Sequence, residues 1–221
     1  MVAALVALLM LSAGSVAAST SPSGSGTYTE KGTRADLYSG ACTANGDDTT
    51  TCSDIGLSVF VGRMSDSFSG VIHGSQVCAN VSSYTFDDAT GEQIGDGTYE
   101  SGCKVDLPKG AITVGKNLTS VKLSTTTVEI EQYVCDEYTC EPESSRDITV
   151  GGTWTGVGAI YQSKSRSSGD DGTCRTSESG SGSNREASFV GTFDALGLGS
   201  DNSYGWLGNG KYTFRSRCSE V

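Results

Sequence analysis

Residues 146–163, with the sequence RDITVGGTWTGVGAIYQS, alternate two kinds of side chain along most of their length. Ile148, Val150 and Trp154 fall on even positions, and threonines such as Thr153 fall on odd ones. A period of two is typical of a β-strand that buries one face. Trp154 offers the largest apolar surface on that face. We therefore expect this stretch to be a long central strand in which Trp154 is buried.

Similar short alternating runs occur along the rest of the chain and are separated by turn residues. Gly occurs 30 times and Pro three times among 221 residues, and no segment after the first twenty residues has helical periodicity. We count about eleven strands at the spacing of a sandwich. The sequence therefore predicts one all-β domain over residues 30–221, built as an antiparallel β-sandwich or open barrel. Loops are expected at residues 43–51, 164–183 and 197–210.

The first 18 residues form an apolar run that ends in small residues. Such a run is typical of a cleaved signal peptide, although it lacks the usual basic start. An upstream start or an uncleaved anchor would also fit this segment. Residues 19–29 are rich in Ser and Gly and predict a flexible linker. Because no second apolar span follows, we expect an extracellular protein without membrane contact after cleavage.

All eight cysteines lie after the apolar run, and an even number in an exported chain predicts four disulfides. Zinc is not expected, because no CxxC occurs and His73 is the only histidine. Local spacing favours pairs that close hairpins or anchor long loops. The predicted pairs are Cys42–Cys52, Cys78–Cys103, Cys135–Cys140 and Cys174–Cys218.

The chain carries 26 acidic and 15 basic residues, which gives a formal net charge of −11. An acidic surface repels nucleic acid and anionic lipid, so neither is an expected partner. We interpret the acidity mainly as a source of solubility.

The sequence WTGVG at residues 154–158, followed by REA at residues 185–187, resembles a pattern of exported bacterial β proteins of unassigned function. The resemblance covers roughly the last third of the chain. It implies a secreted β fold, and it implies no activity and no site residues.

Tyr204 and Trp206 lie in a glycine-rich segment and are the candidate ligand-binding residues. Aromatic rings of this kind stack on sugar rings, but they also cover the open ends of sandwiches. Carbohydrate, or another extracellular protein, is therefore the partner class that the sequence favours.

Asp87 and Asp88 are the candidate metal ligands, because Glu92 and Asp96 follow closely. Calcium prefers several oxygen ligands from a flexible loop, so a structural calcium ion is a hypothesis for this segment. No other cofactor is expected.

Two catalytic arrangements are compatible with the composition. A Ser-His-Asp site would have to use His73, but no GxSxG motif accompanies it. Paired carboxylates hydrolyse glycosides without histidine, and Glu129 and Glu131 share one face of a predicted strand. On an exposed strand such a pair is more often ordinary solvation.

The sequence thus favours a secreted, non-catalytic binding or structural module whose ligand is unknown. The first alternative is a secreted carbohydrate-active hydrolase that uses two carboxylates. The second is a subunit of an extracellular filament, in which the N-terminal segment would pair with a neighbour's sheet edge.

Overall fold

The structure is a computed structural model that describes residues 25–68, 71–135, 140–193 and 203–218. The predicted signal peptide and most of the predicted linker lie outside these residues. The first strand begins at Gly26, inside the range 19–29 expected to be a linker. Its first residues are ordered because they pair with the last strand of the chain.

The described residues form nine β-strands and one short 3-10 helix, and each strand follows the previous one in the chain. The elements are β1 (Gly26–Ala44), β2 (Thr49–Asp66), β3 (Val71–Asp87), β4 (Gln93–Val105), β5 (Ile112–Val114), η2 (Lys116–Leu118), β6 (Ser120–Cys135), β7 (Cys140–Asp170), β8 (Cys174–Phe193) and β9 (Ser203–Cys218).

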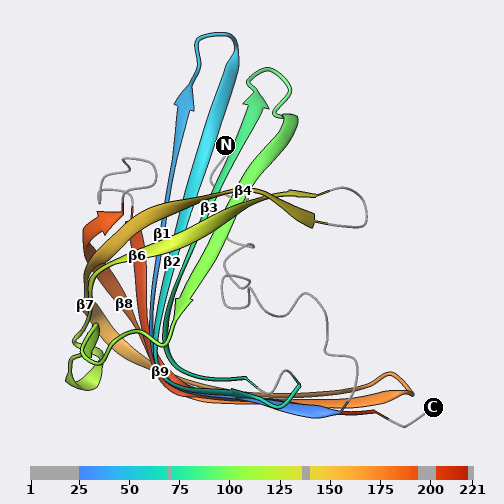
Figure 1. Ribbon diagram of the computed structural model, residues 1–221, viewed down its shortest axis with the longest axis vertical. Coiled ribbons are helices and arrows are strands. Elements are labelled where there is room, and N and C mark those ends of the chain that lie inside the picture. The colour runs from blue at the N-terminus through green and yellow to red at the C-terminus, as the bar shows by residue number, and fades with distance from the viewer. Residues whose placement is uncertain (1–24, 69–70, 136–139, 194–202, 219–221) are drawn as a thin grey trace.

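All nine strands belong to one sheet, in the order β4-β3-β2-β1-β9-β8-β7-β6-β5. The strand pairings are antiparallel, which confirms the predicted all-β class. The sheet also curls back on itself, because β4 pairs with β6 through Glu100 opposite Gln132 and Ser101 opposite Glu131 (Figure 1). This arrangement fits the predicted sandwich or open barrel.

A bidentate ion pair reinforces the joint between β4 and the β6–β7 hairpin. Arg146 Nε donates to Glu100 Oε1 over 2.9 Å, and a second guanidinium nitrogen contacts the other carboxylate oxygen. The hydrogen bonds to Glu100 raise the pKa of Arg146. The two-pair ladder therefore has side-chain support beside it.

The strands are fewer and longer than predicted, and two segments expected to be loops are strands. Residues 164–183 form the end of β7 and the start of β8. Ser203–Gly210 belongs to β9. Ser and Gly have low β-propensity, but here both strand edges are paired, and these ladders order residues that have no apolar pattern.

The apolar face of the sheet packs around Trp154, which is fully buried as predicted. Its ring lies 4.7 Å from that of Phe189 on the neighbouring strand, measured between centroids. Its Nε1 donates a 3.0 Å hydrogen bond to the backbone oxygen of Asp36 on β1, two strands beyond β8. The indole thus satisfies its polar group while it fills the core.

Four strands bend sharply at the base of the upright part of the sheet and continue as a long arm (Figure 1). A row of glycines, one from each strand, crosses the sheet: Gly62, Gly32, Gly210 and Gly182. A Cβ atom at any of them would overlap the backbone of the next strand. We attribute the bend to this glycine row, because only glycine allows such close approach.

Three disulfides join residues directly opposite each other on paired strands, and they match three of the predicted pairs. The bonds are Cys42–Cys52, Cys78–Cys103 and Cys174–Cys218. The backbone also places Cys135 opposite Cys140, but their side chains lie outside the described residues. The fourth pair therefore stays a prediction.

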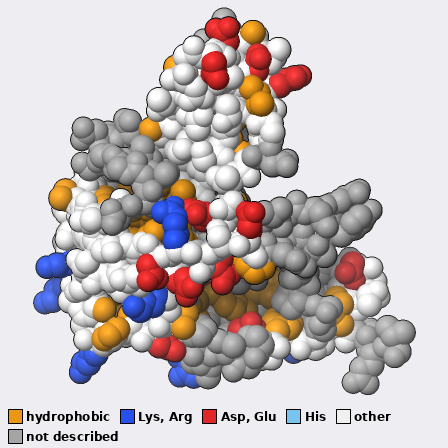
Figure 2. Space-filling view, turned by 45° about the horizontal axis from the view of Figure 1, so that its top comes forward, with side chains coloured by type: hydrophobic (Ala, Val, Ile, Leu, Met, Phe, Trp, Pro, Cys, Tyr) orange, Lys and Arg blue, Asp and Glu red, His pale blue; other side chains and the backbone are white. Residues whose placement is uncertain are grey.

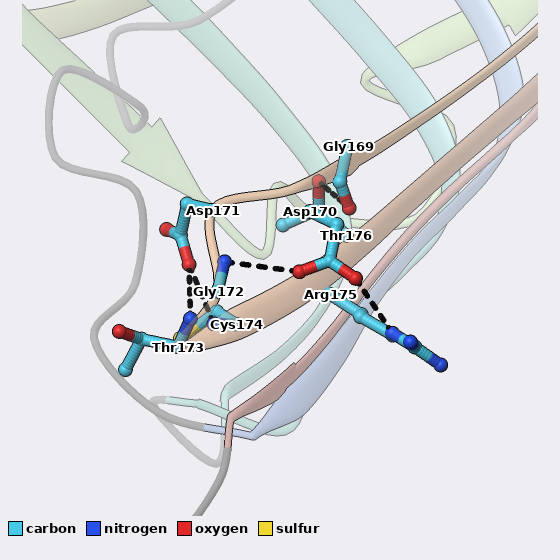
Figure 3. A network of polar contacts seen from close by, with 8 residues as sticks. All are labelled: Gly169, Asp170, Asp171, Gly172, Thr173, Cys174, Arg175 and Thr176. Carbon is cyan, nitrogen blue, oxygen red and sulfur yellow. Dashed lines mark hydrogen bonds and ion pairs between the residues drawn. The ribbon is translucent and has the colours of Figure 1, made fainter.

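The Cys174–Cys218 bond lies beside the tip of the β7–β8 hairpin, whose turn is held by two carboxylates (Figure 3). Asp171 accepts hydrogen bonds from the backbone of Thr173 and Cys174. Asp170 accepts one from Gly172 and pairs with Arg175 at 2.8 Å. These hydrogen bonds lower the pKa of both carboxyl groups.

Replacing Trp154 should destabilise the fold strongly. Trp154→Ala removes the largest buried side chain and its hydrogen bond to β1, so we expect a loss of about 3–5 kcal/mol in denaturant unfolding followed by circular dichroism. In the Trp206→Phe background, fluorescence of Trp154 should be blue-shifted and poorly quenched by iodide. Ready quenching would contradict the buried position.

Reducing the disulfides should also weaken the fold severely. The closed loops span 10, 25 and 44 residues, which corresponds to roughly 3, 3.5 and 4 kcal/mol in the chain-entropy model. We expect reduced, alkylated protein to lose its cooperative unfolding transition, whereas protein alkylated without reduction keeps it. Peptide mapping under non-reducing conditions tests each pair, and Cys135 linked to any residue other than Cys140 would refute the fourth.

Candidate ligand-binding surface

Strand β9 places its aromatic side chains on the outer face of the sheet. Leu207 and Gly205 are buried, whereas the alternating residues Tyr204 and Trp206 point to the opposite side. The two predicted ligand-binding residues therefore lie together on a paired strand and not in a loop, as the sequence suggested. A strand holds such rings more rigidly than a loop does.

The pairing of β9 with β1 brings a third aromatic residue to this face. Tyr38 lies directly opposite Tyr204. We call Tyr38, Tyr204 and Trp206 the aromatic patch. The rings of Tyr204 and Trp206 meet edge to face, with centroids 5.3 Å apart and planes at 82°. Tyr204 is 42% exposed, and Tyr38 and Trp206 are half-buried.

Carboxylates surround the aromatic patch. Trp206 lies between Asp36 on β1 and Glu186 on β8, each directly opposite it in its ladder. Burial and the charge of Glu186 raise the pKa of Tyr204. Burial raises the pKa of Tyr38, and a hydrogen bond to Asp54 adds to the increase. Both phenols thus stay protonated and able to donate hydrogen bonds at neutral pH.

Asp36 is the most unusual of these carboxylates. One of its oxygens, Oδ1, is buried and has no hydrogen-bond partner among the described residues. Burial raises the pKa of Asp36, and Arg34 and a hydrogen bond from Ser58 only partly offset this. The patch therefore combines rings that can stack on sugars with groups that can hydrogen-bond sugar hydroxyls.

The predicted calcium ligands lie at the tip of the β3–β4 hairpin. One oxygen of Asp87 accepts hydrogen bonds from the backbone of Ala89 and Thr90 and from the Thr90 hydroxyl. These bonds lower the pKa of Asp87. Asp88 uses its backbone nitrogen to contact Asp48 of the β1–β2 hairpin. Within the described residues, no group of three or more His, Cys, Asp or Glu side chains could hold a metal ion.

The residues of the two catalytic hypotheses lie far apart in the sheet order. His73 is on β3, with its backbone opposite Met64, and its side chain is outside the described residues. Glu129 and Glu131 line a depression of about 370 Å³ between β3, β4 and β6, beside the Cys78–Cys103 disulfide. The hydroxyl of Tyr133 donates to Glu131, which raises the pKa of that tyrosine.

Comparisons with known proteins do not assign this surface. No protein-family model matches the chain, and no curated protein is significantly similar to it. The crystal structure of a "putative AttH" from Nitrosomonas europaea matches with 12% identity and a TM-score of 0.23. The match covers 86% of this chain and 52% of the other, so the chain spans about half of that protein's length. So low a TM-score supports no argument about fold or function.

The buried carboxyl of Asp36 should make stability depend on pH. Because its pKa is raised in the folded protein, its favourable contribution is complete below the ordinary Asp value of about 4 and is lost as the pH rises through the folded-state value. We expect Asp36→Asn to be more stable than the wild type at neutral pH and to lose that advantage in acid. The measurement is thermal unfolding of both proteins at several pH values.

Asp147 provides the control for this experiment, because its side chain is exposed on β7. Asp147→Asn should shift the melting temperature little, and by a similar amount at every pH. Equal pH profiles for Asp36→Asn and the wild type would contradict the assignment.

Proposed function

We propose that this protein is an exported, non-catalytic binding module, and that the aromatic patch binds carbohydrate. The observation that carries the proposal is the edge-to-face pair of Tyr204 and Trp206 on a paired strand of the outer face. Asp36 and Glu186 on either side of Trp206 supply acceptors for sugar hydroxyls. Rings that stack and polar groups that orient are the usual elements of a sugar site.

Export is part of the same proposal. It is supported by the apolar run at residues 1–18 and by the three disulfides, which persist in oxidising compartments. Among the described residues, no helix has the length and apolar character needed to cross a membrane.

Binding can be measured through the fluorescence of Trp206. In the Trp154→Phe background Trp206 is the only tryptophan, because the chain has two. We expect titration with neutral oligosaccharides of glucose, xylose or mannose to change its emission. Trp206→Ala or Tyr204→Ala should weaken binding in calorimetry about tenfold or more, as expected for a central aromatic contact.

Tyr161 offers a matched control, because it is 58% exposed and lies on β7 outside the aromatic patch. Tyr161→Ala should bind the same oligosaccharides as tightly as the wild type. If no neutral oligosaccharide binds, or if Tyr161→Ala weakens binding as much as Tyr204→Ala, the aromatic patch is not a sugar site.

The hydrolase is the second candidate, and one observation favours it. Glu129 and Glu131 line the same depression, where a bound glycan could meet both carboxylates. Release of reducing sugars by the wild type, lost in both Glu129→Gln and Glu131→Gln, would replace the binding module with this function. The filament alternative stays a prediction, since its N-terminal segment lies outside the described residues.

A further inference from the structure

The arm formed beyond the bend has two chemically different faces. Successive residues of a strand alternate between faces, and directly opposite residues of neighbouring strands share one. On one face lie Tyr28, Tyr212 and Phe214 with the carboxylates Glu30 and Glu178. The other face, here called the basic face, carries eight of the 15 Lys and Arg residues of the chain: Lys31, Arg63, Lys164, Arg166, Arg175, Lys211, Arg215 and Arg217.

Four of these cations form one row across the sheet. Arg63 lies opposite Lys31, and Lys31 lies opposite Lys211. Ser181 follows on β8, and Lys164 on β7 ends the row. With strands about 4.8 Å apart, the row spans roughly 19 Å. Side by side, like charges repel one another, so this arrangement lowers stability.

Few anions balance the basic face from within the protein. Asp170, which pairs with Arg175 at the hairpin tip, is the one carboxylate among its described residues. No ion pair between described residues involves Lys31, Arg63, Lys164 or Lys211, and all four side chains are exposed. A chain of net charge −11 does not need such a cluster for solubility.

The row also lines a depression of about 840 Å³ where the sheet bends. Neutral polar side chains lie between its four cations, namely Gln162, Ser181, Ser183 and Asn209. Gln162 and Ser183 hydrogen-bond each other, and Asn209 donates to Thr33 over 2.7 Å. The depression therefore offers both cations and positioned hydrogen-bonding groups.

We propose that the basic face is a binding site for an anionic polysaccharide that carries sulfate or carboxylate groups. The cation row at the bend binds the anions, and the hydroxyl and amide side chains between the cations bind the sugar hydroxyls. This inference goes beyond the proposed function, because the site is formed by other residues than the aromatic patch and does not depend on it.

The composition of the basic face favours a hydrated polymer over other anionic partners. The exposed large hydrophobic residues of the described chain lie elsewhere. A protein partner or a membrane would need apolar or aromatic anchors at the centre of the contact. A stiff nucleic-acid duplex would extend beyond the arm toward acidic surface. Figure 2 shows acidic side chains over the upper and middle parts, and several Lys and Arg side chains along the left and lower margins.

The test uses the secreted full chain and heparin as the sulfated probe, with alginate as the carboxylated one. We expect salt-sensitive binding to at least one of them in calorimetry and none to dextran. The triple variant Lys31→Gln, Arg63→Gln, Lys211→Gln should bind about tenfold to 100-fold more weakly, because it removes three exposed charged contacts.

The matched control is the triple variant Lys109→Gln, Lys116→Gln, Lys122→Gln. It also loses three exposed cations, but they lie outside the arm. It should bind within about twofold of the wild type, since only long-range, screened attraction changes. Circular dichroism and thermal unfolding confirm that both variants fold.

Three results would overturn the proposal. The first is equal binding by the two triple variants, which would mean attraction without a site. The second is no binding of heparin or alginate at low salt. The third is tighter binding to a DNA duplex or to phosphatidylglycerol vesicles than to either polysaccharide. Trp206→Ala should leave heparin binding unchanged, so failure of the sugar proposal for the aromatic patch is measured separately.

Discussion

The contact of Trp154 with β1 holds the two halves of the sheet together. The indole is fully buried on β7, packs on Phe189 of β8, and reaches across β9 to the backbone oxygen of Asp36. One side chain therefore ties the N-terminal strand to the C-terminal half of the chain. Asp36 is also a neighbour of the aromatic patch. The position of that patch on the outer face thus depends on what the core holds on the inner face.

Alternation and cysteine spacing were sufficient to predict the central strand, the buried tryptophan and the three disulfides. They failed for residues 164–183, because Ser and Gly carry no apolar pattern and the hairpin is ordered by ladders on both sides. They also failed for Tyr38. Its place opposite Tyr204 follows from the pairing of β1 with β9, and local sequence does not encode the register of strands so far apart.

The same limit applies to the charges. A net charge of −11 suggested an evenly acidic surface, whereas the fold collects eight cations on one face of the arm. Those cations come from β1, β2, β7, β8 and β9, and only the pairing of all five strands brings them together. Net charge describes long-range attraction and solubility, but a local surface can have the opposite sign. The two proposed sites therefore differ in chemistry as well as in place.

The pairing of β1 with β9 has a consequence for biosynthesis. Gly26 lies opposite Ser216, so the first strand to leave the ribosome completes its ladder only when almost the whole chain has followed. Pairing across so long a separation is slow and leaves strand edges uncovered in the meantime. During export, the N-terminal strands would wait as a partial sheet with one open edge. A secretion route that delivers the chain unfolded, with chaperones on the far side, suits such a topology.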